Sequence, residues 1–320
     1  CIGSSTDGEI NNDKITTLNT IITISTFDKT TLKIAYVNEK DSFSNGKNLA
    51  TLLCNEDTKL LITFTDGAKT NGEEFLNGIS SINNKIIISG GMAGDNAHFT
   101  QTFISCQNKI LTNGAVGVSF NSKTLKVCNA YNFNWSPIGI EHTIDEVEGN
   151  RVYKISGLTS LDFYEKYLGE YASDLPNSGL RYPLNIKEND DSSHEVIRTL
   201  LGINEEDKSI TFAGDVPVGY KARLMKPDID ELIDGAGKAA EVITKINDKP
   251  AFGLIVSCVG RKIVMNQLID DELEIIQEIL GENVLLSGFY SYGEIAPFQD
   301  NLLNCELHNQ TMTLTTIYES

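Results

Sequence analysis

A phrase of eight residues occurs twice in this chain, and it restricts the fold more than any other feature. The first copy is Gly3-Ser-Ser-Thr-Asp-Gly-Glu-Ile10 and the second is Gly288-Phe-Tyr-Ser-Tyr-Gly-Glu-Ile295, so both fit G-x-x-x-x-G-E-I. A looser variant, Ser89-Gly-Gly-Met-Ala-Gly-Asp95, also follows an apolar run. A strand that runs into glycines and one acid is a common frame for a ligand site. Two copies predict an internal duplication, with related halves that face each other across a cleft.

Two segments of the sequence, one in each half, each predict a βαβ unit. The first has a strand, a helix and a returning strand, at residues 59–64, 73–82 and 85–89. The second repeats this layout at residues 252–257, 270–280 and 284–287, with a loop at 258–261 and Gly281 as the helix cap. The helices are indicated by apolar residues at helical spacing. Ligands in open α/β sheets bind beyond the carboxyl ends of the strands, so we expect a site there.

The apolar pattern between these units changes to a period of two. It predicts an antiparallel meander from four strands, at residues 102–105, 115–120, 125–131 and 152–155. Two further helices are predicted at residues 158–168 and 229–246. The fold class is therefore α/β: two related domains with mixed sheets and a meander between the βαβ units. We place the domain boundary near residue 150, which gives domains 1–150 and 151–320.

Charge and length exclude several classes of partner. The 320 residues include 44 acids and 26 bases, for a net charge of −18, and no basic run. Binding to nucleic acid or to an anionic membrane needs clustered Lys and Arg, so neither partner is expected. No apolar stretch approaches the ~18 residues of a membrane-spanning helix. The six cysteines have no metal-ligand or disulfide spacing, which indicates reduced thiols and a cytoplasmic protein. A lipoprotein that begins at Cys1 is the alternative.

Five segments together resemble the FIST family of sensory modules. The first phrase resembles the family's G-C-S-T-A-G-E-I, with Ser4 in place of Cys and Asp7 in place of Ala. Residues 89–95 resemble G-G-x-A-G-D, and Val256-Ser-Cys-Val-Gly-Arg261 resembles F-S-C-x-x-R. The second phrase, continued to Pro297, and residues 307–314 resemble the carboxyl-terminal signature. The family has further strands before its first motif, so the amino-terminal domain is expected to lack its first strands.

The resemblance implies a bacterial cytoplasmic sensor rather than an enzyme. The output partners that it implies are chemotaxis receptors, histidine kinases or cyclic-di-nucleotide enzymes. The ligands that it implies are small polar molecules, amino acids among them, and some members are similar to haem-containing nitric-oxide sensors.

A free amino acid needs acceptors for its ammonium group and donors for its carboxylate. Three acids can accept from the ammonium group, while Arg261 and the amides of three glycines can donate to the carboxylate. Two tyrosines are placed to wall the site. The predicted ligand contacts are Glu9, Gly90, Gly91, Asp95, Arg261, Gly288, Tyr290, Tyr292 and Glu294.

Each of these residues also fits a structural role. Glu9 and Glu294 can accept backbone N–H bonds and hold their own loops, and Asp95 can cap the segment after it. Arg261 can pair with Glu294 across the duplicated halves. Trp135 fits either a wall of the site or the core. These alternatives are left open by the sequence.

Two chemical alternatives are weaker. A thiol-dependent hydrolase would use Cys258 beside Arg261, with His308 as base, but the chain has no G-x-S-x-G, P-loop or H-E-x-x-H motif. Haem would need a lone histidine, His98 or His308, because none of the four histidines lies at metal-ligand spacing. We therefore expect no catalysis, no metal and no cofactor.

Overall fold

The two predicted βαβ units are present, and each lies at the centre of a six-stranded mixed sheet. The chain is described by a computed structural model, which covers residues 1–192, 194–246, 250–298 and 301–320. It divides into unit 1, made of Cys1–Asn132, Ile233–Leu307 and Thr311–Ser320, and unit 2, made of Phe133–Leu232 and His308–Gln310. The mixed α/β class predicted from the sequence is confirmed. The domain boundary near residue 150 stays a prediction.

Most of the secondary structure belongs to unit 1. Its strands are β1 (Ile2–Ser4), β2 (Glu9–Asn11), β3 (Lys14–Thr16), β4 (Thr31–Val37), β5 (Thr58–Thr65), β6 (Ile87–Met92), β7 (Ile104–Cys106), β8 (Lys109–Leu111), β9 (Ala115–Asn121), β10 (Leu125–Asn132), β19 (Phe252–Cys258), β20 (Leu285–Ser291), β21 (Glu294–Phe298), β22 (Asn301–His308) and β23 (Met312–Glu319). Its helices are α1 (Ser42–Leu53), α2 (Gly72–Ser80), most of α4 (Ile229–Ile246), α5 (Val259–Met265), the 3-10 turn η3 (Asn266–Leu268) and α6 (Ile269–Leu280).

The two six-stranded sheets repeat one plan, which agrees with the predicted duplication. One has the order β22-β21-β6-β5-β9-β4, and the other, read in the same sense, has the order β3-β2-β20-β19-β23-β10. The central pairs β5–β6 and β19–β20 are parallel, and their outer neighbours are antiparallel. The hairpins at the edges are exchanged: β2–β3 completes the sheet of the second βαβ unit, and β21 completes the sheet of the first. The doubled phrase therefore begins both exchanged hairpins.

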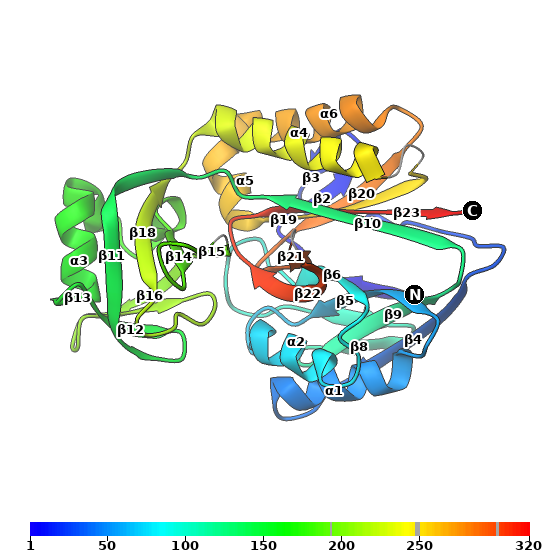
Figure 1. Cartoon of the computed structure of the whole chain (residues 1–320), viewed down its shortest axis with the longest axis horizontal. Coiled ribbons are helices and arrows are strands. Elements are labelled where there is room, and N and C mark those ends of the chain that lie inside the picture. Colours follow the sequence, from blue (N-terminus) through cyan, green and yellow to red (C-terminus); the bar gives the residue numbers. More distant parts are fainter. Residues whose placement is uncertain (193, 247–249, 299–300) are drawn as a thin grey trace. The chain divides into compact units, whose positions relative to one another are not determined.

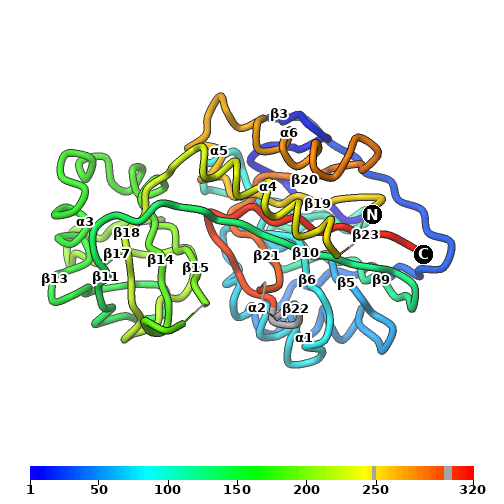
Figure 2. The backbone as a smooth tube through the Cα atoms, turned by 45° about the horizontal axis from the view of Figure 1, so that its top comes forward, coloured from blue at the N-terminus to red at the C-terminus, as the bar shows by residue number. Residues whose placement is uncertain are grey.

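The two sheets of unit 1 pack face to face between two layers of helices (Figure 1). Helices α1 and α2 cover the outer face of one sheet, and α4 and α6 cover the outer face of the other sheet. The core between the sheets contains Leu60 and Ile62 from the first sheet with Leu254, Val256 and Phe289 from the second. Residues 17–30, between β3 and β4, contain no helix or strand and run along the outside of this unit (Figure 2).

The helices follow their sequence signals. Helix α6 buries Ile269, Leu273 and Ile276 at helical spacing, carries acids in its first turn and ends at Gly281. Gly281 has a φ of 91°, which side chains disfavour, so the predicted cap is confirmed. The side chain of Asn71 accepts the N–H of Glu74 and caps α2 in the same local way.

Unit 2 is an antiparallel layer with one short helix. Its elements are β11 (Ser136–Glu148), β12 (Arg151–Ile155), β13 (Leu158–Thr159), α3 (Ser160–Leu168), the 3-10 turns η1 (Gly169–Asp174) and η2 (Asn177–Arg181), β14 (Leu184–Lys187), β15 (Glu195–Arg198), β16 (Leu200–Asn204), β17 (Ser209–Phe212) and β18 (Lys221–Lys226). Its core surrounds Phe163, Tyr164 and Phe212. Within the described ranges, the chain contains no helix with the length and apolar character needed to cross a membrane.

Three local predictions are wrong. The four strands of the expected meander belong to four different sheets, as β7, β9, β10 and β12. The segment 258–261 is not a loop, because α5 begins at Val259. Gly90, Gly91 and Gly288 lie inside β6 and β20 rather than in loops after them. A period of two shows that a segment is a strand, but the partner of a strand depends on distant residues.

The glycine inside β20 allows two strands to approach closely. A Cβ atom added to Gly288 would lie 1.8 Å from the carbonyl oxygen of Ile255 in β19. We predict that Gly288→Ala lowers the free energy of unfolding by about 1–3 kcal/mol, as overpacking does elsewhere. Gly202→Ala in β16 is the control, since no atom lies within 4 Å of its added Cβ. Chemical denaturation followed by circular dichroism tests this, and equal stability of the two variants would contradict it.

Candidate functional site

The two copies of the doubled phrase share one hydrogen bond, from the residue at the fourth position to the glutamate. In the first copy the Thr6 hydroxyl donates to Glu9 Oε1 at 2.8 Å, and in the second the Ser291 hydroxyl donates to Glu294 Oε1 at 2.8 Å. Each glutamate is the first residue of its strand, β2 or β21. The remaining Glu9 oxygen accepts from the Thr16 hydroxyl and from the N–H of Asn19, both at 3.1 Å. Both carboxylates therefore hold their own turns.

Glu294 is completely buried. Its Oε2 accepts the N–H of Thr311 at 3.3 Å, and burial raises its pKa to about 8. The hydrogen bonds from Ser291 and Thr311 oppose this shift only in part. A carboxyl group in this position favours its protonated form near neutral pH because the charged form loses its hydration.

Asp95 organises the segment that follows it, as the capping alternative predicts. Its carboxylate accepts the N–H groups of Phe99, Thr100 and Gln101 at 2.8–2.9 Å. The hydroxyl of Tyr292 donates to the same carboxylate, and the rings of Tyr292 and Phe99 stack with centroids 4.4 Å apart. Despite partial burial, these hydrogen bonds lower the pKa of Asp95 well below its usual range. Asp95 and Tyr292, predicted as separate ligand contacts, thus contact each other.

Arg261 is fully buried, and so is its partner, Glu272 of α6. Its Nε donates to Glu272 Oε1 at 3.0 Å, its Nη2 donates to the same oxygen, and the Ser257 hydroxyl donates to Oε2 at 3.3 Å. Arg261 thus hydrogen-bonds to Glu272, and its charge also acts on Glu294, the partner suggested by the sequence, where it opposes the rise in pKa. The guanidinium group is therefore enclosed by protein atoms.

The remaining predicted contacts are also parts of the packed interior. Tyr290 is fully buried, and the ammonium group of Lys262 lies 5.9 Å from the centre of its ring. A Cβ on Gly90 would lie 1.9 Å from the carbonyl oxygen of Thr63, and one on Gly91 would lie 2.9 Å from Val256 and from Gly293. These glycines bring backbones together. That these residues contact a ligand stays a prediction. The structure brings them into one region of unit 1.

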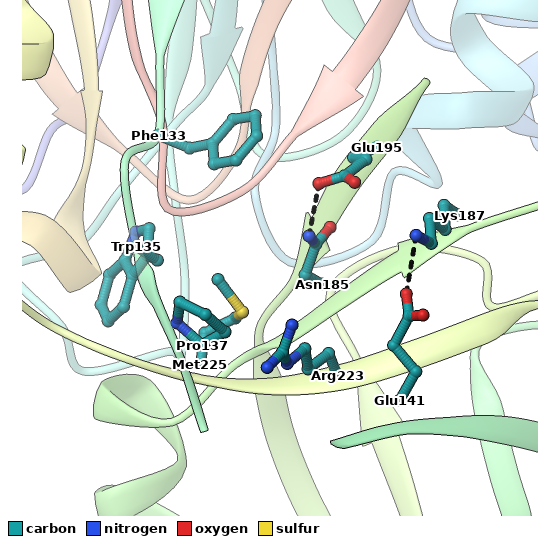
Figure 3. A pocket seen from close by; sticks show the side chains of 9 residues that line it. All are labelled: Phe133, Trp135, Pro137, Glu141, Asn185, Lys187, Glu195, Arg223 and Met225. Carbon is teal, nitrogen blue, oxygen red and sulfur yellow. Dashed lines mark hydrogen bonds and ion pairs between the residues drawn. The ribbon is translucent and has the colours of Figure 1, made fainter. Parts of the chain in front are cut away.

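An open pocket of about 250 Å³ lies in unit 2 (Figure 3). It is lined by one apolar wall and a set of charged and amide side chains: Phe133, Trp135, Pro137, Glu141, Asn185, Lys187, Glu195, Arg223 and Met225. The strand register explains the set, because Asn185 pairs with Arg223 and Pro137 pairs with Met225. Alternate residues of β14 and β18 point to one face of a sheet, so residues 185, 187, 223 and 225 converge.

The charges of the pocket are only partly paired with each other. Lys187 Nζ lies 2.7 Å from Glu141 Oε1, and this bond raises the pKa of Lys187. Glu195 accepts from the neutral amide of Asn185 at 2.6 Å, and the buried Oδ1 of Asn185 has no hydrogen-bond partner among the described residues. Two acceptors therefore lie side by side, and the cation that acts on Glu195 is Lys187, its cross-strand neighbour, which is itself ion-paired with Glu141.

A bulge in β11 places Arg223, the second cation of the pocket. Three residues, 139–141, stand opposite the single Arg223 of β18, and Gly139 takes a φ of 65° that favours glycine. Arg223 donates from Nε and Nη2 to the carbonyl oxygen of Gly139, at 3.1 and 2.7 Å. Figure 3 shows its guanidinium group between Met225 and Glu141. A carbonyl is a weaker partner for this group than a carboxylate, which can bind it in a bidentate way.

Sequence reasoning missed Arg223, Glu195 and Asn185. The available signal was the alternation of polar and apolar residues in 184–187 and 221–226. The sequence left open whether Trp135 lines a ligand site or packs in the core. Trp135 lines this pocket, and its Nε1 donates to the carbonyl oxygen of Gln310 at 3.0 Å. It does not lie in the unit of the glycine-rich strands.

The residues of the chemical alternatives are not among those that line this pocket. Cys258 is buried in unit 1, at the end of β19, with 3% of its surface exposed. His98 is exposed in the segment after Asp95, and His308 is buried at 3% exposure. Among the described residues, no group of three or more His, Cys, Asp or Glu side chains is arranged to hold a metal. The haem alternative stays a prediction.

Two family models match the chain. The FIST N domain matches residues 1–158, and the FIST C domain matches residues 160–297. Together the matched segments span both copies of the doubled phrase up to Pro297. No curated protein matches the chain.

Proposed function

The chain belongs to the FIST family, whose domains are sensory, and on this premise we propose that it binds a small zwitterion of the amino-acid type in the pocket of unit 2. Binding would be passed to an output partner in the bacterial cytoplasm: a chemotaxis receptor, a histidine kinase or a cyclic-di-nucleotide enzyme. A sensor of this kind needs only a difference in ligand affinity between two conformations, and no chemical step.

The pairing pattern of the pocket is the observation that carries the proposal. Among the described residues, the hydrogen bonds of the Arg223 guanidinium group go to one backbone carbonyl, so a ligand carboxylate is a stronger partner. Glu195 and Asn185 Oδ1 offer adjacent acceptors for an ammonium group. Met225 and Pro137 supply apolar surface beside them. A concave site with few convergent polar groups is the usual form of a small-molecule site, and about 250 Å³ is small for the class.

The region of the doubled phrase supports a ligand less well. Its acids accept hydrogen bonds from their own turns, and Arg261, Tyr290 and Glu294 are fully buried. A ligand would have to replace these contacts, whereas the pocket of unit 2 is open. We therefore assign ligand contact to the pocket and a structural role to the glycine-rich strands.

Calorimetry with free amino acids, simple amines and simple carboxylates tests the pocket. We expect amino acids to bind, and Arg223→Gln and Glu195→Gln each to weaken binding by roughly tenfold or more, because a hydrogen bond to a charged group contributes about 1.5–3 kcal/mol. Trp135, the one tryptophan of the chain, lines the pocket, so its fluorescence should change on binding.

The matched controls are Arg181→Gln and Glu205→Gln, which change exposed residues of unit 2 outside the pocket. Both should bind like the wild type. If no amino acid binds, or if the pocket variants bind as tightly as the controls, the assignment is wrong. Absorbance after incubation with haem tests the alternative separately, since a Soret band that depends on His98 or His308 would favour it.

A further inference from the structure

Asp7 is a buried acid that neither the pocket nor the ligand prediction uses. It stands at the fifth position of the first phrase, between β1 and β2, and only 1% of its surface is exposed. Its Oδ1 accepts the N–H of Ala97 at 2.5 Å, while its Oδ2 is buried and has no partner among the described residues. Gly94 encloses Oδ2, because a Cβ added there would lie 1.8 Å from it.

The duplication places two equivalent residues against one loop. Tyr292 stands at the fifth position of the second phrase, as Asp7 does in the first. Asp7 bonds to the backbone of Ala97, and Tyr292 bonds to Asp95 and stacks on Phe99. Residues 94–101, the gripped loop, are thus held by contacts from both copies of the phrase.

The gripped loop has a strained backbone. Ala97 and Phe99 have φ values of 58° and 53°, in a region that costs such residues roughly 1–2 kcal/mol, while Asn96, at 60°, is a residue that tolerates it. Such conformations persist only where surrounding contacts enforce them. Loss of one contact therefore favours release of the loop.

The charges around Asp7 come from every side. Asp95 of the gripped loop is a like charge, and Lys262 of α5 donates to the backbone oxygen of Asp7. Tyr292 contributes a phenol group, the N–H of Asp7 donates to the carbonyl oxygen of Tyr290, and Glu9 of β2 also acts on Lys262. His98 is exposed in the gripped loop itself. An ionised Asp7 would add a second negative charge beside Asp95 in a place closed to water.

We propose that Asp7 and the gripped loop form a proton sensor, closed while Asp7 is protonated and open once it ionises. The loop opens because hydration of the new carboxylate requires Gly94 and Ala97 to move away, and the strained backbone favours that movement. Burial raises the pKa of Asp7, and the hydrogen bond from Ala97 opposes this rise in part. The resulting pKa is about 7, so the loop opens near neutral pH. The sensor acts independently of ligand in unit 2.

Hydrogen exchange of the backbone amides in 94–101, on the full chain at pH 6 and pH 8, tests the proposal. After correction for intrinsic exchange rates, we expect protection in the wild type to fall by roughly tenfold between the two pH values, as the ionised fraction rises. Asp7→Asn keeps the acceptor for Ala97 and cannot ionise, so its loop should stay protected at both pH values. Asp95→Asn should expose the loop at both, because it weakens the bonds to residues 99–101.

His98→Gln is the control for titration of the histidine in the same loop. It should keep the response of the wild type. The proposal is overturned by equal protection of the wild type at both pH values, by a response that survives in Asp7→Asn, or by one that disappears in His98→Gln. Carbon-13 NMR of the Asp7 carboxyl group gives a second readout, and titration near pH 4 would also overturn it.

Discussion

Glu272→Ala is expected to lower the free energy of unfolding by about 3–5 kcal/mol, the usual cost of removing one member of a buried ion pair. Both Glu272 and Arg261 are fully buried, and the carboxylate accepts from Arg261 and from Ser257. Removing the carboxylate takes away the two hydrogen bonds that the buried guanidinium group donates to Glu272 Oε1. Chemical denaturation followed by circular dichroism measures the loss.

Two comparisons separate this charge effect from other causes. Glu274→Ala changes an exposed residue of the same helix and should cost little. Replacing both partners, as Arg261→Met with Glu272→Leu, should cost less than Glu272→Ala, because no lone charge is buried. If the single and double variants lose the same stability, packing rather than charge explains the effect.

Asp7→Asn is expected to remove about 4 kcal/mol of pH dependence from the stability of the protein. The pKa of Asp7 is raised from 3.8 to about 7, and each unit corresponds to about 1.4 kcal/mol. A raised folded pKa means that the native state holds the proton more tightly than the unfolded state. Its contribution is therefore complete below pH 4 and is lost as the pH rises to about 7. The variant should match the wild type near pH 4 and exceed it at pH 8.

Asp13→Asn provides the control, since Asp13 is exposed in the turn between β2 and β3. It should follow the wild type at every pH. Glu294, with a pKa of about 8, also makes the protein less stable as the pH rises. It is present in the wild type and in both variants, so the difference between their stability curves is due to Asp7. A wild type and an Asp7→Asn variant with parallel stability curves would contradict the prediction.

The sequence located single elements with good accuracy. Helix α4 was predicted at 229–246 and is observed at Ile229–Ile246, and α6 was predicted at 270–280 and is observed at Ile269–Leu280. Helices depend on local spacing and on caps such as Gly281, so a single segment contains the necessary signal. Helix α1 was not predicted, although Asp41 caps it by accepting the N–H of Ser44.

The candidate site was harder to predict because it depends on partners. Asp95 was recognised as a possible cap, but its bond to Tyr292 joins residues 197 positions apart. Arg261 was expected beside a ligand or Glu294, and helix α6 also brings Glu272 to it as a hydrogen-bond partner. The pocket of unit 2 requires the register of β14, β15 and β18 and the bulge at Gly139, none of which a local pattern specifies.

The doubled phrase by itself determined that the chain contains a duplication and that a glutamate follows each glycine turn. Local chemistry suffices for this, because Thr6 and Ser291 each bond to a glutamate three residues away. Only the tertiary structure decided that the two hairpins exchange sheets and that Asp7 and Tyr292 hold one loop. Strand pairing and the burial of Asp7 arise from residues far apart in the chain, so they exist only once the sheets have assembled.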